Sequence, residues 1–559
     1  MSDTRIGIPS PLPSTAEQTF PTLTAAQIER LAVHGNLRRV EAGEVLLKAW
    51  EKTERFFVVT SGGIDAVRQS ASGEDLVTVI RTGQFTGELS MLSGRRGFLT
   101  LRAVEAGEVI EIGRDQLVTL VQTDSELSDI LMRAFILRRA TLIANGIGDV
   151  VLVGSAHSSG TLRIKEFLTR NGHPYAYIDL DRDAGAQELL DRFHVAVGDV
   201  PVLICRGTSV LRNPSNSEIA DCLGFNEAID QALVRDVVIV GAGPSGLAAA
   251  VYGASEGLDV LVLEMNSPGG QAGSSSKIEN YLGFPTGISG RELAGRAYTQ
   301  AQKFGAQVII AKGAKALTCH RKPYVIEIDD GSHIEARSVI ISTGAEYRRL
   351  AVDNLSRFDG MGVYYGATFV ESQLCEDEEV IVVGGGNSAG QAAVFLAQTA
   401  RRVHVVVRSS GLADSMSRYL IRRIEESPAI VLHTHTEIAA LEGDERLERV
   451  TWRDTQRGAV ETQDIHHLFV MTGAIPNTGW LQGCVALDGA GFIKTGPDLS
   501  PDDLSGARWP LSRAPHLLET SLPGVFAVGD VRGHNVKRVA SAVGEGSLAV
   551  SFVHQVLHE

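Results

Sequence analysis

Two glycine-rich turns, each lying between an apolar strand and a helix of small residues, are the parts of this chain best suited to chemistry. The first lies in VVIVGAGPSGLAAAVYGASEGLDVLVLE (Val237–Glu264) and the second in VIVVGGGNSAGQAAVFLA (Val380–Ala397). Glycines at such turns let the backbone approach a pyrophosphate, and the N-terminus of the following helix then faces the phosphates. Two such turns predict two dinucleotides held face to face, an arrangement suited to hydride transfer.

An acidic residue follows the first turn at the expected distance. Glu264 ends the next apolar strand, close to the expected spacing of about 20 residues, where it would accept hydrogen bonds from a ribose. A lone GxGxxG is a weak signal, but the strand, helix and acid together make a strong one. We predict dinucleotide contacts in this half at Gly241, Gly243, Pro244, Ser245, Gly246 and Glu264.

The second turn has the GxGxxA form, and its following strand ends differently. Residues 403–407 run into Arg408 instead of an acid, with Ser409 and Ser410 beside it. A cation and hydroxyls can accept a 2′-phosphate, whereas a carboxylate would favour NADH, so we predict NADPH. The alternative is a scaffold that has lost its nucleotide. The predicted contacts are Gly384, Gly386, Asn387, Ser388, Ala389, Arg408 and Ser409.

Composition limits the class of protein. At 559 residues the chain should form three or four domains, and it contains no apolar run long enough to span a membrane. The net charge of −15, with no basic stripe, argues against nucleic-acid binding. The five cysteines are scattered without CxxC spacing, which excludes a zinc ribbon and a local redox dithiol. We therefore expect a cytoplasmic protein with no metal site.

From about residue 236 onward, the chain resembles the low-molecular-weight thioredoxin reductase family of flavoproteins. The resemblance is carried by Gly269-Gly270-Gln271, Ile278-Glu279-Asn280, Ser342–Ala345 and Val528–Val531. It implies FAD in the first half and homodimerisation, with Gly473 closing the nicotinamide-binding domain. Lys537 and Arg538 depart from the family pattern, and a cation there would favour reduced flavin. The alternative for both is a solvated helix start. The FAD contacts implied by the family are Gly270, Gln271, Asn280, Thr343, Gly344, Ala345, Gly529, Asp530, Lys537, Arg538 and Val539.

The dithiol that takes electrons from flavin in this family is missing. Where the family has Cys-Ala-Thr-Cys, this chain reads Gly366-Ala367-Thr368-Phe369, preceded by Tyr364 and Tyr365. Nicotinamide could still reduce the flavin, but the family's thiolate route to thioredoxin is closed. Tyr365 and Phe369 are candidate catalytic residues that would stack on the flavin or bind substrate, although the tyrosines could instead pack at a hinge. Cys375 is expected to be inert packing, with a relocated thiol as the alternative.

The N-terminal part, residues 22–145, shows short strands between glycine turns and then helices, as in a small β-barrel. TGQFTGELSMLSGRRGFLTLRA resembles the phosphate-binding cassette of the cyclic nucleotide-binding domain. The resemblance would place Gly87, Glu88 and Leu89 at a cyclic nucleotide, with Arg96 nearby. The family's phosphate-binding arginine falls on Gly97. The alternative is a barrel that serves only for docking or dimerisation.

Residues 149–223 alternate strand and helix and resemble a thioredoxin or glutaredoxin fold. Helices are expected over about 160–171 and around 186–193. Val200-Pro201 matches that family's cis-proline, although the proline could simply set a turn. The redox loop should fall near residues 155–160, which read SAHSSG and contain no cysteine; His157 is read as a surface loop residue. Dithiol exchange is therefore impossible at this position.

Together these patterns predict a multidomain α/β protein with a β-barrel N-terminal domain and two Rossmann-like domains. The predicted function is an FAD-dependent NAD(P)H oxidoreductase that passes electrons directly from flavin to a small molecule or redox protein, with a regulatory barrel and a possible cyclic nucleotide ligand. The alternatives are a thioredoxin-disulfide reductase using a relocated or partner thiol, and a flavin- or nucleotide-responsive regulator with little catalysis. The predicted boundaries are a tail at 1–21, the cyclic nucleotide-binding-like domain at 22–145, the thioredoxin-like domain at 149–223, the FAD domain at 234–350 and 478–559, and the NAD(P)H domain at 355–477.

Overall fold

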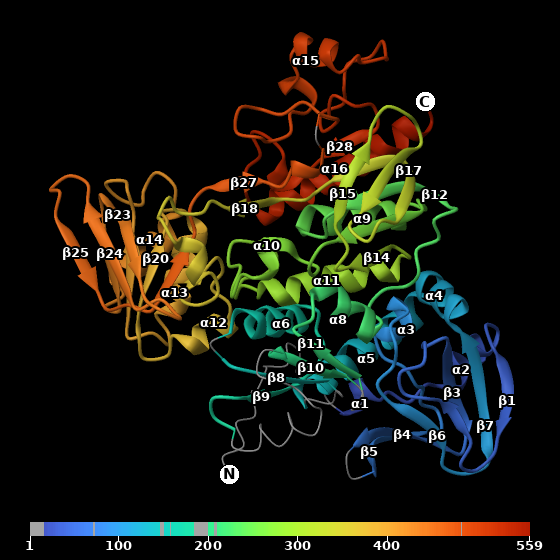
Figure 1. The fold of residues 1–559 in the computed structure, drawn as a ribbon. Coiled ribbons are helices and arrows are strands. Elements are labelled where there is room, and N and C mark those ends of the chain that lie inside the picture. Colours follow the sequence, from blue (N-terminus) through green and yellow to red (C-terminus); the bar gives the residue numbers. More distant parts are fainter. Residues whose placement is uncertain are drawn as a thin grey trace.

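A computed structural model describes residues 16–70, 73–145, 150–156, 158–183, 199–205, 209–481 and 483–559 (Figure 1). Most of the predicted N-terminal tail, His157 and the helix expected around residues 186–193 lie outside these ranges. In Figure 1 the N-terminal β-rich part lies at the lower right, the first dinucleotide fold above it, and the second dinucleotide fold to the left. A smaller α/β unit lies at the centre, below both dinucleotide folds.

The N-terminal part, here called the barrel unit (residues 16–145), consists of antiparallel sheets ordered β1-β7-β3 and β2-β6-β4-β5. Its main core is built around Phe56, Phe85 and Phe135, all fully buried, so the helix carrying Phe135 closes one side of the strands. The elements are α1 (Ala16–Thr19), α2 (Ala25–Ala32), β1 (Asn36–Val40), β2 (Val45–Leu47), β3 (Arg55–Ser61), β4 (Gly63–Ser70), β5 (Gly73–Arg81), α3 (Ser90–Ser93), β6 (Thr100–Ala103), β7 (Gly107–Gly113), α4 (Arg114–Thr123) and α5 (Ser125–Ala144).

The next segment, here called the central unit (residues 150–226), has a four-stranded sheet ordered β11-β10-β8-β9. β8 pairs with β9 in parallel and with β10 antiparallel. The Val200–Pro201 peptide bond is cis, in agreement with the resemblance to a thioredoxin or glutaredoxin fold. Ser158 caps the first helix through its hydroxyl, which accepts from Thr161 N. The elements are β8 (Val150–Gly154), α6 (Ser159–Arg170), β9 (Ala176–Asp179), β10 (Val202–Cys205), β11 (Ser209–Arg212) and α8 (Asn216–Leu223).

The first dinucleotide fold, here called the FAD unit, has a sheet ordered β14-β13-β12-β17-β16-β15, with β28 also paired to β17. β14, β13, β12, β17 and β28 are parallel, whereas β16 and β15 extend the same sheet as antiparallel strands. The elements are β12 (Val234–Val240), α9 (Pro244–Ser255), β13 (Val260–Glu264), α10 (Gly270–Gly273), α11 (Gly290–Lys303), β14 (Gln307–Ile310), β15 (Ala314–Thr318), β16 (Tyr324–Ile328), β17 (His333–Ile341), η4 (Gly496–Asp498), α15 (Pro501–Gly506), β28 (Val525–Ala527), η5 (Gly529–Val531) and α16 (Val539–Leu557).

The second dinucleotide fold, here called the nicotinamide unit, has a parallel sheet ordered β19-β26-β20-β21-β22 and a separate antiparallel sheet β23-β24-β25. The short antiparallel pair β18–β27 connects it to the FAD unit. The elements are β18 (Ala345–Tyr347), η2 (Leu355–Phe358), β19 (Val363–Tyr364), α12 (Phe369–Leu374), β20 (Glu379–Val383), α13 (Asn387–Leu396), β21 (Arg402–Val406), α14 (Arg418–Glu426), β22 (Ile430–His433), β23 (Thr436–Glu442), β24 (Arg449–Asp454), β25 (Val460–Gln463), β26 (His467–Val470) and β27 (Ala474–Pro476). After β27 the chain returns to the FAD unit, where η3 (Gly479–Leu481) joins the core.

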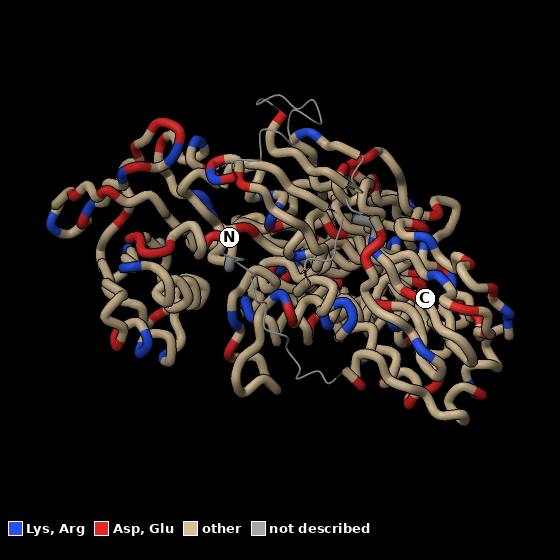
Figure 2. The backbone as a smooth tube through the Cα atoms, turned by 90° about the horizontal axis from the view of Figure 1, so that it is seen from below, with Lys and Arg blue, Asp and Glu red and all other residues tan. Residues whose placement is uncertain are grey.

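Charged residues of both signs are distributed along the described chain. Figure 2 shows Lys and Arg interspersed with Asp and Glu along the described backbone, without a continuous basic stripe. Among the described residues, no helix combines the length and apolar character that crossing a bilayer requires. Within the same ranges, no three His, Cys, Asp or Glu side chains come together as a metal site.

A buried histidine lies where the barrel unit meets the central unit. His173 is 4% exposed, and its ring lies 5.3 Å from that of Phe98 and 5.4 Å from that of Phe225. Burial lowers the pKa of His173 well below its usual value, and the nearby guanidinium groups of Arg139 and Arg95 lower it further. The folded protein therefore holds a neutral imidazole at this interface.

We expect acid to weaken this interface through His173. Because its folded pKa is depressed, its contribution to stability is present above the unfolded value of about 6.5 and is lost as pH falls below that value, by about 1.4 kcal/mol per pH unit. In the variant His173→Phe, the new ring should fit between Phe98 and Phe225, and the loss of stability in acid should disappear because the residue no longer titrates. The prediction is checked by measuring the unfolding temperature of both proteins between pH 7.5 and pH 5. If the unfolding temperature of both proteins falls equally with pH, the prediction is contradicted.

Candidate cofactor-binding site

The three glycines of the first turn have three different surroundings. Gly241 has a φ of +104°, and an added Cβ would lie 2.4 Å from Ser342 O. At Gly246 an added Cβ would lie 1.9 Å from Gly241 O, so close helix–strand packing demands glycine there. At Gly243 the nearest atom to an added Cβ is Gly270 Cα, 3.9 Å away. Protein packing therefore does not explain Gly243, whereas a pyrophosphate approaching the helix N-terminus does.

Glu264 holds this turn together. Its Oε2 accepts a hydrogen bond from Ala242 N at 2.8 Å, and its Oε1 accepts from Asn266 N and Ser267 N at 2.8 and 3.1 Å. Burial raises the pKa of Glu264, and these amides act in the opposite direction. The carboxylate fixes the loop at the end of β13, where the sequence predicted a ribose contact.

Of the other predicted FAD residues, Gly270 lies beside Gly243, and Thr343 lies beside Gly241. Gln271 Nε2 donates to Ala345 O at 2.5 Å, and Thr343 Oγ1 donates to Asn477 O at 2.8 Å. Burial raises the pKa of Asp530, an effect that nearby Lys537 opposes. The remaining predicted FAD residues are placed as follows in the chain. Gly344 and Gly529 have positive φ angles, and Gly270 starts α10. Pro244 and Ser245 start α9, Arg538 precedes Val539 at the start of α16, and Asn280 is exposed.

The second turn repeats the same pattern. Gly384 has a φ of +144°, and an added Cβ would lie 2.4 Å from Met471 O. An added Cβ at Gly386 would meet nothing within 4 Å, and Ala389 is fully buried under the turn. A second open cradle therefore lies at the N-terminus of α13. Of the other predicted contacts, Asn387 accepts from Ser417 N at 2.7 Å, Ser388 follows it in α13, Arg408 and Ser409 are exposed after β21, and Gly473 has a φ of +51°.

One residue that the sequence analysis did not single out lies between the second turn and Asp530 of the FAD unit. Tyr347 ends β18, where burial raises its pKa; its hydroxyl hydrogen-bonds Ser388 and lies close enough to Asp530 to feel its charge. A second link joins the units at the predicted flavin side, where Arg423 forms an ion pair with Glu279. The nicotinamide and FAD units therefore contact each other beside the second fingerprint and at Glu279.

Comparison with known proteins agrees with this geometry. Residues 235–546, more than half of the chain, match the pyridine nucleotide-disulphide oxidoreductase family, and residues 37–124 match the cyclic nucleotide-binding domain. The chain belongs to this oxidoreductase family. The thioredoxin reductase of Mycolicibacterium smegmatis is 34% identical over 316 residues, which is 56% of this chain and 94% of that protein. The thioredoxin reductase of Ureaplasma parvum is 31% identical over 327 residues, 58% of this chain and 97% of that protein.

Solved structures give the same assignment. Lactococcus lactis thioredoxin reductase in the FR conformation has a TM-score of 0.52 and 27% identity, covering 58% of this chain and all of that one. Thermoplasma acidophilum thioredoxin reductase has a TM-score of 0.52 and 29% identity, covering 58% and 99% of the two chains. The predicted fold class and the predicted membership of a thioredoxin reductase-like family are confirmed. FAD and NADPH are the cofactors that thioredoxin reductases of this family use.

The loop at residues 366–369, which is predicted to stand where the family has its dithiol, is packed inside the nicotinamide unit. Thr368 caps α12, and Tyr364 is buried with its ring 5.2 Å from Phe469. Tyr365 donates its hydroxyl to Asp359 Oδ1 at 3.0 Å, so this hydroxyl is already engaged within the nicotinamide unit. Only the backbone of Phe369 is described, at the start of α12. The catalytic roles of Tyr365 and Phe369 remain predictions.

The cysteines do not replace the dithiol at this loop. Cys375 is fully buried, and burial raises the pKa of its thiol far above the usual range, which suits inert packing. Cys319 and Cys484 form a disulfide across 165 residues, a pairing that their spacing did not reveal. Both belong to the edge of the core between β15–β17 and η3 in the FAD unit.

Side chains of α3 and α5 pack against the cyclic nucleotide cassette. An added Cβ at Gly87 would lie 3.1 Å from Met91 and 3.2 Å from Phe135. Arg138 donates to Gly87 O at 2.9 Å, and Arg139 lies 3.6 Å from the Glu88 carboxylate. The two other predicted contacts are Leu89, which precedes α3, and Arg96, whose side chain lies against Gly224 of the central unit.

Proposed function

We propose that this chain is an FAD-dependent oxidoreductase that takes hydride from NADPH and passes electrons to an acceptor without a thiol of its own. Two observations carry the proposal. Gly243 and Gly386 both leave open cradles at helix N-termini, and the loop at residues 366–369 contains no cysteine. Bound FAD would supply the two-electron chemistry, receiving the hydride and releasing electrons to a small molecule or redox protein.

The residues of the chain have separate tasks in this reaction. The amide groups at the start of α9 and α13 would bind the two pyrophosphates, and Glu264 keeps the first loop in place. Asp530 and Lys537 would lie along the flavin, as the family resemblance implies. Tyr347 and the Glu279–Arg423 ion pair orient the nicotinamide unit toward the FAD unit. The cytoplasmic location and the homodimer also remain predictions.

We expect Arg408 to select NADPH over NADH. Its exposed guanidinium after β21 can form charge-assisted hydrogen bonds with a 2′-phosphate, worth about 1.5–3 kcal/mol. The variant Arg408→Ala should therefore raise the KM for NADPH by about 10- to 100-fold and leave the KM for NADH unchanged. Steady-state reduction of ferricyanide measures both constants. The matched control is Arg402→Ala, an exposed arginine at the other end of β21; equal losses for both nucleotides would contradict the role.

Anaerobic titration of the purified protein tests the function as a whole. The protein as isolated should show flavin absorbance, and NADPH should bleach it within the dead time of manual mixing, faster than NADH does. A colourless protein that does not reconstitute with FAD would end the proposal. Bleaching by neither nucleotide would leave the nicotinamide unit as a scaffold.

The thioredoxin-disulfide reductase alternative makes a different prediction. It needs a reactive thiol or a partner's dithiol, and Cys375 is buried with a raised pKa. Reduction of insulin by NADPH, thioredoxin and this protein would support the alternative. Reduction of quinones or ferricyanide without activity toward insulin would support direct electron release from flavin.

The barrel unit is better suited to docking than to nucleotide sensing. Arg138 donates to Gly87 O, Arg139 lies 3.6 Å from the Glu88 carboxylate, and Arg95 donates to Asn171 O in the central unit at 3.4 Å. Calorimetric titration with cyclic AMP and cyclic GMP should show no heat of binding. Binding that depends on the flavin redox state would instead favour the regulatory alternative.

A further inference from the structure

Helix α6 of the central unit touches both dinucleotide units, one at each end. At its C-terminal end, Arg170 Nη2 donates to Gly270 O at 2.7 Å. Arg170 also lies near Glu264, whose carboxylate holds the first glycine-rich turn. This end of α6 is therefore bound to the loop where the FAD pyrophosphate is expected.

The other end of α6 is bound to the nicotinamide unit. Leu162 is 8% exposed and belongs to the same apolar core as Tyr364 and Val370, on the two sides of the loop that lacks the dithiol. α6 packs against α12, and Ser159 lies so close to Gly360 that an added Cβ on Gly360 would be 2.9 Å from Ser159 Cβ. Figure 1 shows α6 beside α12, which lies to its left, and below α10.

The central unit is itself fixed to the FAD unit. Ile310 and Ala311, at the end of β14, belong to the core of the central unit together with Phe167. Asn226 Nδ2 donates to Ile310 O, and Ile310 N donates to Asn226 Oδ1, both at 2.8 Å. These contacts anchor α6 to the FAD unit. The contact that Leu162 of α6 makes with the nicotinamide core therefore holds the nicotinamide unit relative to the FAD unit.

From these contacts we infer that α6 is the positioning element that holds the nicotinamide unit against the FAD unit in the orientation that places Tyr347 beside Ser388 and pairs Arg423 with Glu279. Leu162 is its positioning residue, because it lies in the nicotinamide core while its own helix is bonded to the FAD loop. In this chain the central unit, whose expected redox loop at residues 155–160 contains no cysteine, thus serves as a fixed brace between the cofactor domains. The inference rests on the proposed function in one respect, namely that the orientation held by α6 is the one used for hydride transfer.

The experiment replaces Leu162 by aspartate in the full chain. A carboxylate cannot remain in the apolar core without a partner, so the contact between α6 and α12 should open. Hydrogen exchange of residues 360–375 should become about tenfold faster or more. The rate of flavin reduction at saturating NADPH should fall by about tenfold, because small misplacements of reacting groups are costly. The Kd for NADPH should change by less than about twofold.

Matched variants separate positioning from general damage. Arg163→Gln alters the same helix, but its hydrogen bonds go to Asn216 and Pro214 within the central unit, so both readouts should stay at the wild-type level. Leu162→Met should restore them, and Leu162→Ala gives a milder form of the defect if the aspartate variant does not fold. Unchanged exchange and unchanged flavin reduction in the Leu162 variants would overturn the inference. If wild-type protein is not reduced by NADPH, the proposed function fails, and exchange at residues 360–375 still decides the role of α6.

Discussion

Replacing Gly243 by valine is expected to give a folded protein that no longer retains FAD. The backbone at Gly243 has φ −70° and ψ −175°, which any residue adopts, and its added Cβ would find no protein atom closer than 3.9 Å. The branched side chain would instead occupy the cradle at the N-terminus of α9. We expect FAD affinity to fall by about 100-fold or more, about 2.7 kcal/mol. The ratio of flavin to protein absorbance after gel filtration measures this loss.

Two other glycine variants make this experiment specific. Gly295 lies exposed in α11 with nothing within 4 Å of an added Cβ, so Gly295→Val should keep its FAD. Gly246→Val should damage the fold as well as the site, because its Cβ would overlap Gly241 O. Circular dichroism should therefore be normal for the variant at Gly243 and altered for the variant at Gly246. Full FAD occupancy in the Gly243 variant would show that the open cradle serves another purpose.

Local chemistry made these turns predictable from the sequence. A tight turn with positive φ needs glycine at Gly241 and Gly384, and close helix packing needs a small residue at Gly246 and Ala389, so spacing alone identified both folds. The cis bond before Pro201 was implied only by the resemblance of residues 149–223 to a thioredoxin or glutaredoxin fold, with a simple turn as the alternative. Spacing and backbone conformation at the turns are local properties of the chain, so they could be recognised in the sequence.

What the sequence did not reveal depends on contacts between distant segments. Arg138 and Arg139 look like ordinary helix residues, and only the fold carries them to the cassette at Gly87 and Glu88. Tyr347 bonds Ser388 because a short linking strand passes between the two units. Leu162 reads as a buried residue of its own helix, although it completes the core of another unit. The hydrophobic periodicity of a segment indicates which side chains are buried, but it does not indicate which distant residues they contact.

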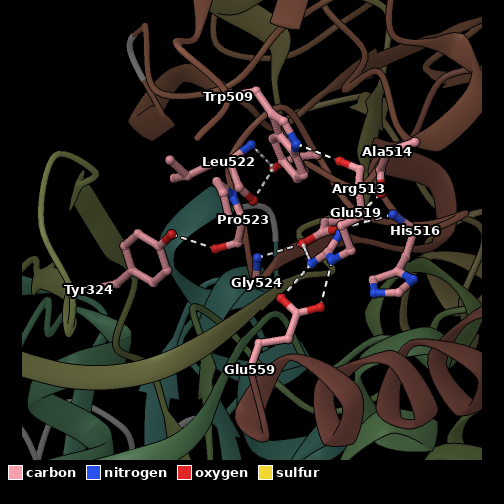
Figure 3. A network of polar contacts seen from close by, with 11 residues as sticks. Tyr324, Trp509, Arg513, Ala514, His516, Glu519, Leu522, Pro523, Gly524 and Glu559 are labelled. Atoms are coloured by element: carbon pink, nitrogen blue, oxygen red, sulfur yellow. Dashed lines mark hydrogen bonds and ion pairs between the residues drawn. The ribbon is translucent and has the colours of Figure 1, made fainter. Parts of the chain in front are cut away.

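An arginine near the C-terminus illustrates the same limit and stabilises the FAD unit. Arg513 forms two hydrogen bonds with Glu519, at 2.7 and 3.1 Å, and two with Glu559, at 2.6 and 3.0 Å (Figure 3). Glu519 is fully buried and also accepts from His516 N and Gly524 N. The two carboxylates raise the pKa of Arg513 above its usual value. The segment that follows α15 is thereby tied to the end of α16.

Arg513→Met should destabilise the FAD unit by about 3–5 kcal/mol, since removing one partner leaves the buried carboxylate of Glu519 uncompensated. Urea unfolding followed by tryptophan fluorescence measures the change, with Trp509, whose ring lies 5.6 Å from the Arg513 guanidinium, as a local reporter. The control Glu559→Gln removes a partner that is 39% exposed and should cost less than about 1 kcal/mol. Equal losses for the two variants would mean that the ion pair with Glu519 is not the dominant interaction. If Glu519→Gln combined with Arg513→Met restores most of the lost stability, the cost lies in the unpaired buried charge, and not in the packing of the arginine side chain.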